Sequence, residues 1–178
     1  TSNNQAGYVN ISCLDTAKPV LVKVRKTSGL TSKEINVLLS IYFKCDRNGL
    51  YKIKSLDSLA SQIYMSRPTL DRALIRLNNL DIIAYSKQDK LITLLDYDEP
   101  QKYGYAIMSE QMLTEEFFRL DISSKRLILY LVSLQATHGI KVSYTKLKQV
   151  ARKNSDSKLE KTAEKINHFY TFHTYKNC

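Results

Sequence analysis

The sequence predicts a mainly α-helical fold with small β-hairpins, built from two helix-turn-helix units in tandem. Three observations lead to this prediction. Residues 55–80 contain two short amphipathic helical patterns separated by a tight turn. A hairpin pattern follows them directly, over residues 82–95. A second set of similar segments then recurs about 90 residues further along the chain.

The helix pair at residues 55–80 is the clearest pattern in the chain. Ser55 is placed to cap the first helix and Ser66 to cap the second. Pro68 falls in the first turn of the second helix, where the missing N–H of proline is harmless. Both helices repeat apolar residues at the spacing of one buried face. The expected buried residues are Leu56, Leu59, Ala60, Ile63, Leu70, Ala73, Leu74 and Leu77.

The opposite face of the second helix carries residues that suit a DNA major groove. Arginine can bind guanine through two hydrogen bonds, asparagine can bind adenine, and threonine with a helix N-terminus can hold phosphate. The candidate DNA-binding residues of this helix are Arg67, Pro68, Thr69, Arg72, Arg76 and Asn79. The alternative interpretation is a helical hairpin of some other small α-domain, with its arginines exposed to solvent.

The run Ser-Arg-x-Thr-Leu-x-Arg-Ala-Leu begins at Ser66 and leads into a Leu-x-x-Leu-x-Ile-Ile exit at residues 77–83. This combination resembles the helix-turn-helix of winged-helix DNA-binding proteins. The resemblance implies a unit over residues 31–95 in which a helix, a short strand and two helices precede a hairpin, the wing. Lys87 and Lys90 lie at the expected tip of that wing and are candidates for contact with phosphate or the minor groove.

The segments before the helix pair fit the same unit. Thr31 and Glu34 form a capping-box pattern that opens a helix with an apolar face. Residues 50–54 read as a short strand. Nearer the N-terminus, residues 8–14 and the alternating residues 19–26 predict two further strands.

A second copy of the unit is predicted in the C-terminal part of the chain. Three segments match in order: Ser123 with Thr31, Ser143 with Ser55, and Ser155 with Ser66, at offsets of 92, 88 and 89 residues. Lysine replaces arginine on the outer face, and lysine suits phosphate better than base edges. The candidate DNA-binding residues here are Lys146, Lys158, Lys161 and Lys165.

These patterns predict a division of the chain into three parts. Residues 1–98 hold an N-terminal strand segment and the first unit, residues 99–104 form a polar linker, and residues 105–178 hold the second unit. A helix is expected within residues 105–120. A strand is expected over residues 169–175 with no return strand after it, so the second unit is expected to be degenerate or truncated.

The composition favours an acidic partner. The 178-residue chain has a formal net charge of +10 and a pI of about 9.4, which suits nucleic acid or an anionic surface. No apolar run approaches the ~18 residues needed to cross a bilayer, and no signal peptide is visible. We therefore expect no membrane partner and a cytoplasmic protein, associated with a bacterial nucleoid.

The sequence lacks the usual signatures of catalysis. It has no Gly-rich phosphate loop, no pair of metal-binding histidines and no nucleophile beside a base. Cys13, Cys45 and Cys178 are scattered and suggest neither a disulfide framework nor a metal site. We expect that the protein is not an enzyme and has no catalytic residues, no metal and no cofactor.

Double-stranded DNA is the expected partner, with a second copy of the chain as a further candidate. The leading hypothesis is a sequence-specific DNA-binding protein that acts as a transcriptional regulator. The alternative is a plasmid- or phage-type replication initiator, because the tandem units are similar to initiators that carry two winged helices in one chain. A protein-interaction module is a third hypothesis, which Arg72, Arg76 and the lysines argue against.

Overall fold

The structure is a computed structural model that describes residues 6–10, 19–22, 29–95, 97, 106–134 and 140–174. This part of the chain is mainly helical, with three small antiparallel sheets. The helices are α1 (Ser32–Lys44), α2 (Leu56–Gln62), α3 (Arg67–Asn79), α5 (Glu115–Arg119), α6 (Ile122–Ser133), α7 (Tyr144–Ala151) and α8 (Asp156–Lys165), with one 3-10 turn, η2 (Glu110–Met112). The strands are β1 (Ala6–Asn10), β2 (Pro19–Val22), β3 (Leu50–Lys52), β4 (Ile83–Ser86), β5 (Leu91–Leu94), β6 (Ala106–Ser109), β7 (Ile140–Lys141) and β8 (Thr171–Thr174).

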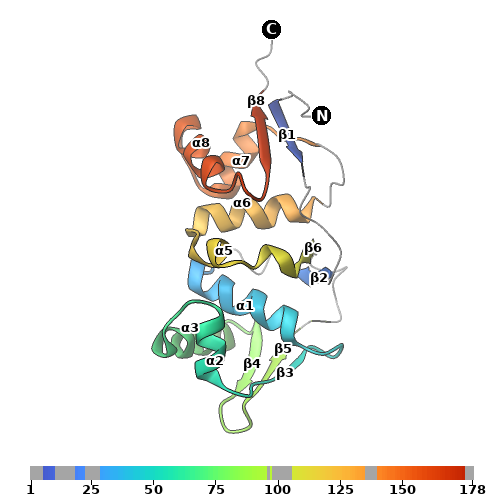
Figure 1. Ribbon diagram of the computed structural model, residues 1–178, viewed down its shortest axis with the longest axis vertical. Helices are drawn as coiled ribbons and strands as arrows, with labels where there is room; N and C mark the ends of the chain where they lie inside the picture. Colours follow the sequence, from blue (N-terminus) through green and yellow to red (C-terminus); the bar gives the residue numbers. More distant parts are fainter. Residues whose placement is uncertain are drawn as a thin grey trace.

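The elements stack along one long axis (Figure 1). Residues 29–95, which we call the N-terminal half, lie at one end, and residues 106–174, the C-terminal half, make up the rest together with β1 and β2. Within each half one helix packs across the stack, α1 in the first and α6 in the second. None of the helices in the described residues is long and apolar enough to span a membrane.

The N-terminal half follows the order α1, β3, α2, α3, β4, β5. Its sheet has the strand order β3-β5-β4, so the last strand lies in the middle and pairs with both neighbours, Ile92 lying opposite Tyr51 and Tyr85. The expected capping box is confirmed, since Thr31 accepts from the Glu34 N–H and the Glu34 carboxylate accepts from the Thr31 N–H. All eight apolar residues expected to be buried in the helix pair are buried, seven of them in α2 and α3 and Ile63 at the C-terminal cap of α2.

The C-terminal half repeats this order with one change. Helix α6, strand β7, helices α7 and α8, and strand β8 follow in sequence. Their sheet has the order β7-β1-β8, so its middle strand comes from the beginning of the chain. Tyr8 lies opposite Lys141, and Val9 lies opposite Phe172.

This pairing corrects two expectations. The second sheet does not lack a third strand, because β1 occupies the position that β5 has in the first sheet. The strand at residues 6–10 therefore belongs with the C-terminal half, and not with residues 1–98 as the sequence suggested. No local pattern could place β1 there, because its partners lie more than 130 residues away in the sequence. The expected linker, residues 99–104, lies outside the described residues.

Helix caps refine the match between the halves. Ser143 and Ser155 cap α7 and α8, as Ser55 and Ser66 cap α2 and α3. The first helices, however, are capped by Thr31 and by Asp121. The segment at Thr31 therefore corresponds to the segment at Asp121, two residues before the expected match at Ser123.

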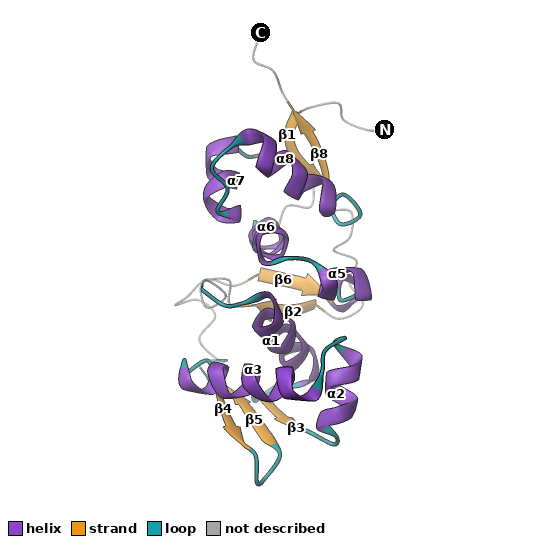
Figure 2. Cartoon of the chain, turned by 90° about the vertical axis from the view of Figure 1, so that its left-hand side faces the viewer, coloured by secondary structure: helices purple, strands orange, loops and turns teal. Residues whose placement is uncertain are grey.

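Residues 105–120 also differ from expectation. A single helix is expected there from the sequence, but the described residues form β6, η2 and the short α5. Strand β6 pairs with β2, Leu21 lying opposite Ile107. Figure 2 shows this two-stranded sheet between α1 and α6. The sheet therefore lies where the two halves meet.

A buried polar network joins the halves beside that sheet. The Lys125 side chain of α6 is fully buried, and its Nζ donates to Ser32 Oγ at 2.6 Å and to the Phe118 carbonyl at 2.9 Å. Asn36 of α1 donates to the same carbonyl at 2.9 Å. Burial, helped by the charge of Lys33, lowers the pKa of Lys125 to about 7. The junction thus depends on a lysine whose partners are neutral oxygen atoms.

Candidate nucleic-acid interface

Helix α3 is held so that one face is buried and the other is open. Ser66 caps it by accepting from the Thr69 N–H, and Pro68 lies in its first turn. The buried face packs into the core through the leucines and alanine described above. On the opposite face, the exposed residues at helical spacing are Pro68, Arg72, Ile75 and Asn79. We call these four residues the α3 stripe.

Two members of the α3 stripe stand out chemically. Arg72 donates from its Nη2 to Thr69 Oγ1 at 3.4 Å, and no carboxylate in the described part of the chain holds its guanidinium. Ile75 is 56% exposed, the most exposed of the large apolar side chains in the structure's described residues. The sequence places Ile75 on the outward face of this helix, but Ile75 is not among the candidate DNA-binding residues.

Arg67 has a different environment from the one its sequence suggested. Its Nη1 lies 3.2 Å from Asp57 of α2, and its Nε lies 3.1 Å from Asp71 of α3. Two carboxylates thus hold this guanidinium at the corner between α2 and α3. The geometry makes Arg67 a link between the two helices, which leaves fewer donors for a base or a phosphate.

Arg76 is also occupied. Its Nε lies 2.9 Å from Oε1 of Glu34, whose side chain is only 6% exposed. Glu34 in turn belongs to the capping box of α1. Arg76 therefore ties α3 to α1, and this contact accounts for a buried carboxylate that the sequence pattern identified only as part of a cap.

Lys87 and Lys90 lie in the turn that joins β4 to β5, and both are exposed. Neither forms an ion pair within the described residues. Ser86 and Asp89 shape the turn, because the Ser86 hydroxyl donates to the Asp89 carboxylate at 2.7 Å and accepts from the Asp89 N–H. The hairpin therefore presents two ammonium groups from a turn with defined internal bonds.

Helix α8 carries three candidate lysines of the C-terminal half, and all three are exposed. Lys158 donates to Asn154 at 2.9 Å, and Lys161 has no ion pair within the described ranges. Lys165 lies 2.6 Å from Asp121, the cap of α6. Burial raises the pKa of Asp121, but bonds from Lys165 and Ser124 outweigh it and lower that pKa to about 2. Lys165 thus links α8 to α6, as Arg76 links α3 to α1.

Charge on α8 is balanced, although the lysine pattern alone suggested a basic helix. The helix contains Asp156, Glu160 and Glu164 beside its three lysines. Asp156 lies 2.7 Å from Lys148 of α7, an ion pair that joins α7 to α8 much as Arg67 and Asp57 join α3 to α2. The expected candidate Lys146, on α7, places its Nζ 5.7 Å from the centre of the Tyr130 ring.

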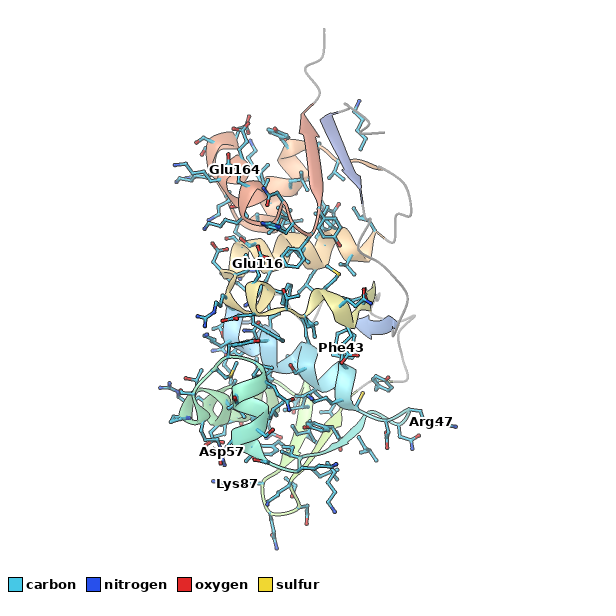
Figure 3. All side chains as sticks on the ribbon, viewed as in Figure 1. Phe43, Arg47, Asp57, Lys87, Glu116 and Glu164 are labelled. Carbon is cyan, nitrogen blue, oxygen red and sulfur yellow. The ribbon has the colours of Figure 1, made fainter. Side chains whose placement is uncertain are left out.

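Helices α3 and α8 lie toward the same side of the molecule, the left of Figure 1 and the near side of Figure 2. Helix α5 lies between them. Tyr64, in the turn before α3, contacts Phe118 of α5 with ring centres 6.0 Å apart, and Arg119 stacks over the same tyrosine. His168, just after α8, lies 3.7 Å from Glu116, which Figure 3 places on this side. The turn before α3 and a residue just after α8 therefore both contact α5.

No protein-family model, no curated protein and no solved structure matches the chain. A metal site is also missing from the described residues, in which no three His, Cys, Asp or Glu side chains gather to hold an ion. The candidate interface offers an arginine without a carboxylate partner in the described ranges, an exposed isoleucine and an asparagine on α3, and lysines at the hairpin and on α8.

Proposed function

We propose that this chain is a sequence-specific double-stranded DNA-binding protein that acts as a transcriptional regulator, with a winged-helix unit in each half. The observation that carries the proposal is the α3 stripe, where Arg72 has no carboxylate partner among the described residues and lies on an exposed helical face. The orders of helices and strands in the two halves, and their matching sheets, support the winged-helix assignment.

In this proposal α3 enters the major groove. Arg72 hydrogen-bonds guanine, Asn79 hydrogen-bonds adenine, and Ile75 contacts a thymine methyl group. Lys87 and Lys90 bind phosphate at the hairpin. Arg67 and Arg76 have supporting roles, because their carboxylate partners fix the position of α3 against α2 and α1.

Helix α8 contributes less to specificity in the same proposal. Its exposed lysines Lys158 and Lys161, with Lys146 of α7, bind phosphate, and phosphate contacts carry no sequence information. The two halves of the chain would then bind one DNA molecule along one side, since α3 and α8 face the same way (Figure 2).

The experiment that tests this proposal first selects bound sites from random duplex DNA. It then compares the affinity of Arg72→Ala for a selected site with that of the wild type. Arg72→Ala should abolish a base contact worth ~1–3 kcal/mol, and binding to the selected site should therefore weaken about 5- to 150-fold. Binding to random duplex should change far less. Arg47→Ala, at an exposed position in the turn before β3, is the matched control. Equal weakening on both DNAs would contradict base recognition by Arg72.

A replication initiator is the second candidate function. It is favoured by the unequal charge of α3 and α8, because two unlike helices on one side suit a non-palindromic site that can be repeated in tandem. The same selection experiment separates the two candidates. Recovery of iterated direct repeats from the random duplex would support an initiator, and recovery of one short site would support a regulator.

A further inference from the structure

A pocket of about 480 Å³ lies in the N-terminal half, and none of its lining residues belongs to α3. It is bounded by the end of α1, by β3 and the segment that follows it, by α2, and by one residue of η2. Its volume is within the range of ~300–1,000 Å³ that small-molecule sites have in proteins. The pocket is therefore large enough for a ligand with a ring as well as a charged group.

Three lysines give the pocket its charge. Lys44, Lys52 and Lys54 all line it, and none of them forms an ion pair within the described residues. Glu110 of η2 is the single carboxylate of the lining and also forms no ion pair in that part of the chain. The lining thus carries three positive charges against one negative charge. This excess matches a ligand with nearly two negative charges, which is the charge of a phosphate monoester at neutral pH.

The rest of the lining suits a ring with polar edges. Phe43 and Leu59 line the pocket but are almost fully buried, so the ring surface open to a ligand is mainly that of Tyr51; Figure 3 labels Phe43 near the end of α1. Tyr51 is half-buried, and burial raises the pKa of its hydroxyl, which keeps it a neutral donor at neutral pH. Ser58 and Gln62 of α2 add a hydroxyl and an amide, bonded to each other at 3.3 Å.

We propose that this pocket binds a nucleoside monophosphate or a closely similar ring-bearing phosphate monoester. Lys44, Lys52 and Lys54 bind the phosphate, as lysine does in many phosphate sites. The ring lies against Tyr51, and Glu110 accepts hydrogen bonds from an amino group of the ligand. This assignment does not depend on the proposed DNA binding, because it uses none of the residues of the α3 stripe.

Calorimetric titration of the full chain with AMP, adenosine and inorganic phosphate tests the proposal, in the absence of DNA. AMP should bind one per chain with a Kd below about 1 mM. Adenosine and inorganic phosphate should each bind at least about tenfold more weakly, because each lacks one of the two groups that the pocket holds. Failure of AMP to saturate the protein, or equal binding of adenosine or phosphate, would overturn it.

A pair of double variants then locates the site. Lys52→Gln/Lys54→Gln should weaken AMP binding at least about tenfold. The control, Lys33→Gln/Arg47→Gln, removes the same charge from exposed residues that do not line the pocket, and AMP affinity should change less than about twofold. Equal effects of the two variants would mean that net charge attracts AMP. A pocket variant that loses affinity for random duplex DNA but keeps AMP binding would assign these lysines to DNA and also overturn the proposal.

Discussion

Helices α3 and α8 hold corresponding places in the two halves, yet their exposed faces differ. Each follows a serine cap, and each is tied by one basic residue to the first helix of its half, Arg76 to Glu34 and Lys165 to Asp121. Away from these ties, α3 exposes Arg72 with no carboxylate partner in the described residues, whereas α8 alternates lysines with acids. Two helices that are anchored to their halves in the same way can therefore expose different side chains to a partner.

The largest expected difference between the two ties is in how much each contributes to the stability of the protein. Arg76→Ala leaves the nearly buried Glu34 carboxylate without its cationic partner, and because Arg76 itself is 53% exposed the loss should be about 2 kcal/mol of unfolding free energy, less than for a fully buried pair. Lys165→Ala frees Asp121, which is 41% exposed, and should cost less than about 1 kcal/mol. Urea denaturation of both variants measures this. Similar decreases in stability would show that the two ties are equivalent.

Next in size is the dependence on spacing along DNA. In the proposal the separation of α3 and α8 is fixed, because the buried contacts of Lys125 and Asn36 join the two halves and the segments beside both helices contact α5. Inserting ~5 base pairs between the two segments of a selected site should weaken binding about tenfold, since the second groove then faces away. An insertion of ~10 base pairs should restore part of the affinity. Equal binding at every spacing would remove α8 from the interface.

The junction between the halves should respond to pH. Lys125 has a folded-state pKa of about 7, below its ordinary value of 10.5, so between these values the unfolded chain binds more protons. The stability of the wild type relative to Lys125→Met should therefore rise with pH across this window, by at most about 1.4 kcal/mol per pH unit. Below the folded-state pKa the difference between the two proteins stops changing with pH, because the lysine is then protonated in both the folded and the unfolded chain. Parallel stability curves would contradict a lowered pKa.

The smallest effect concerns phosphate binding by α8. Lys158→Gln/Lys161→Gln should lower the slope of log K against log salt by roughly 0.9 for each phosphate that the variant no longer neutralises, on any duplex. Lys165 is left out because Asp121 already holds it. Lys87→Gln/Lys90→Gln provides the comparison at the hairpin. If only the hairpin variant changes the slope, the lysines of α8 are exposed to solvent and do not touch DNA.

The sequence patterns correctly predicted the features that depend on residues close together in the chain. The leucines of α2 and α3 are buried as their spacing indicated, and the capping box at Thr31 forms. The partners of Arg67 and Arg76 could not be read this way, because Asp57 and Glu34 lie on other helices. A helical face predicts that a side chain points outward, but it does not reveal which distant carboxylate meets it there.

The sheet of the C-terminal half has a consequence for synthesis of the chain. Its middle strand, β1, precedes both of its neighbours, β7 and β8, by about 130 residues or more, and Ala6 lies opposite Thr174. During translation β1 must wait until nearly all of these residues have left the ribosome before both of its neighbours exist, whereas β4 and β5 can pair as soon as their short turn is made. A circularly permuted gene that places β1 directly after β8 would give the second sheet a hairpin of its own and let that half close without waiting.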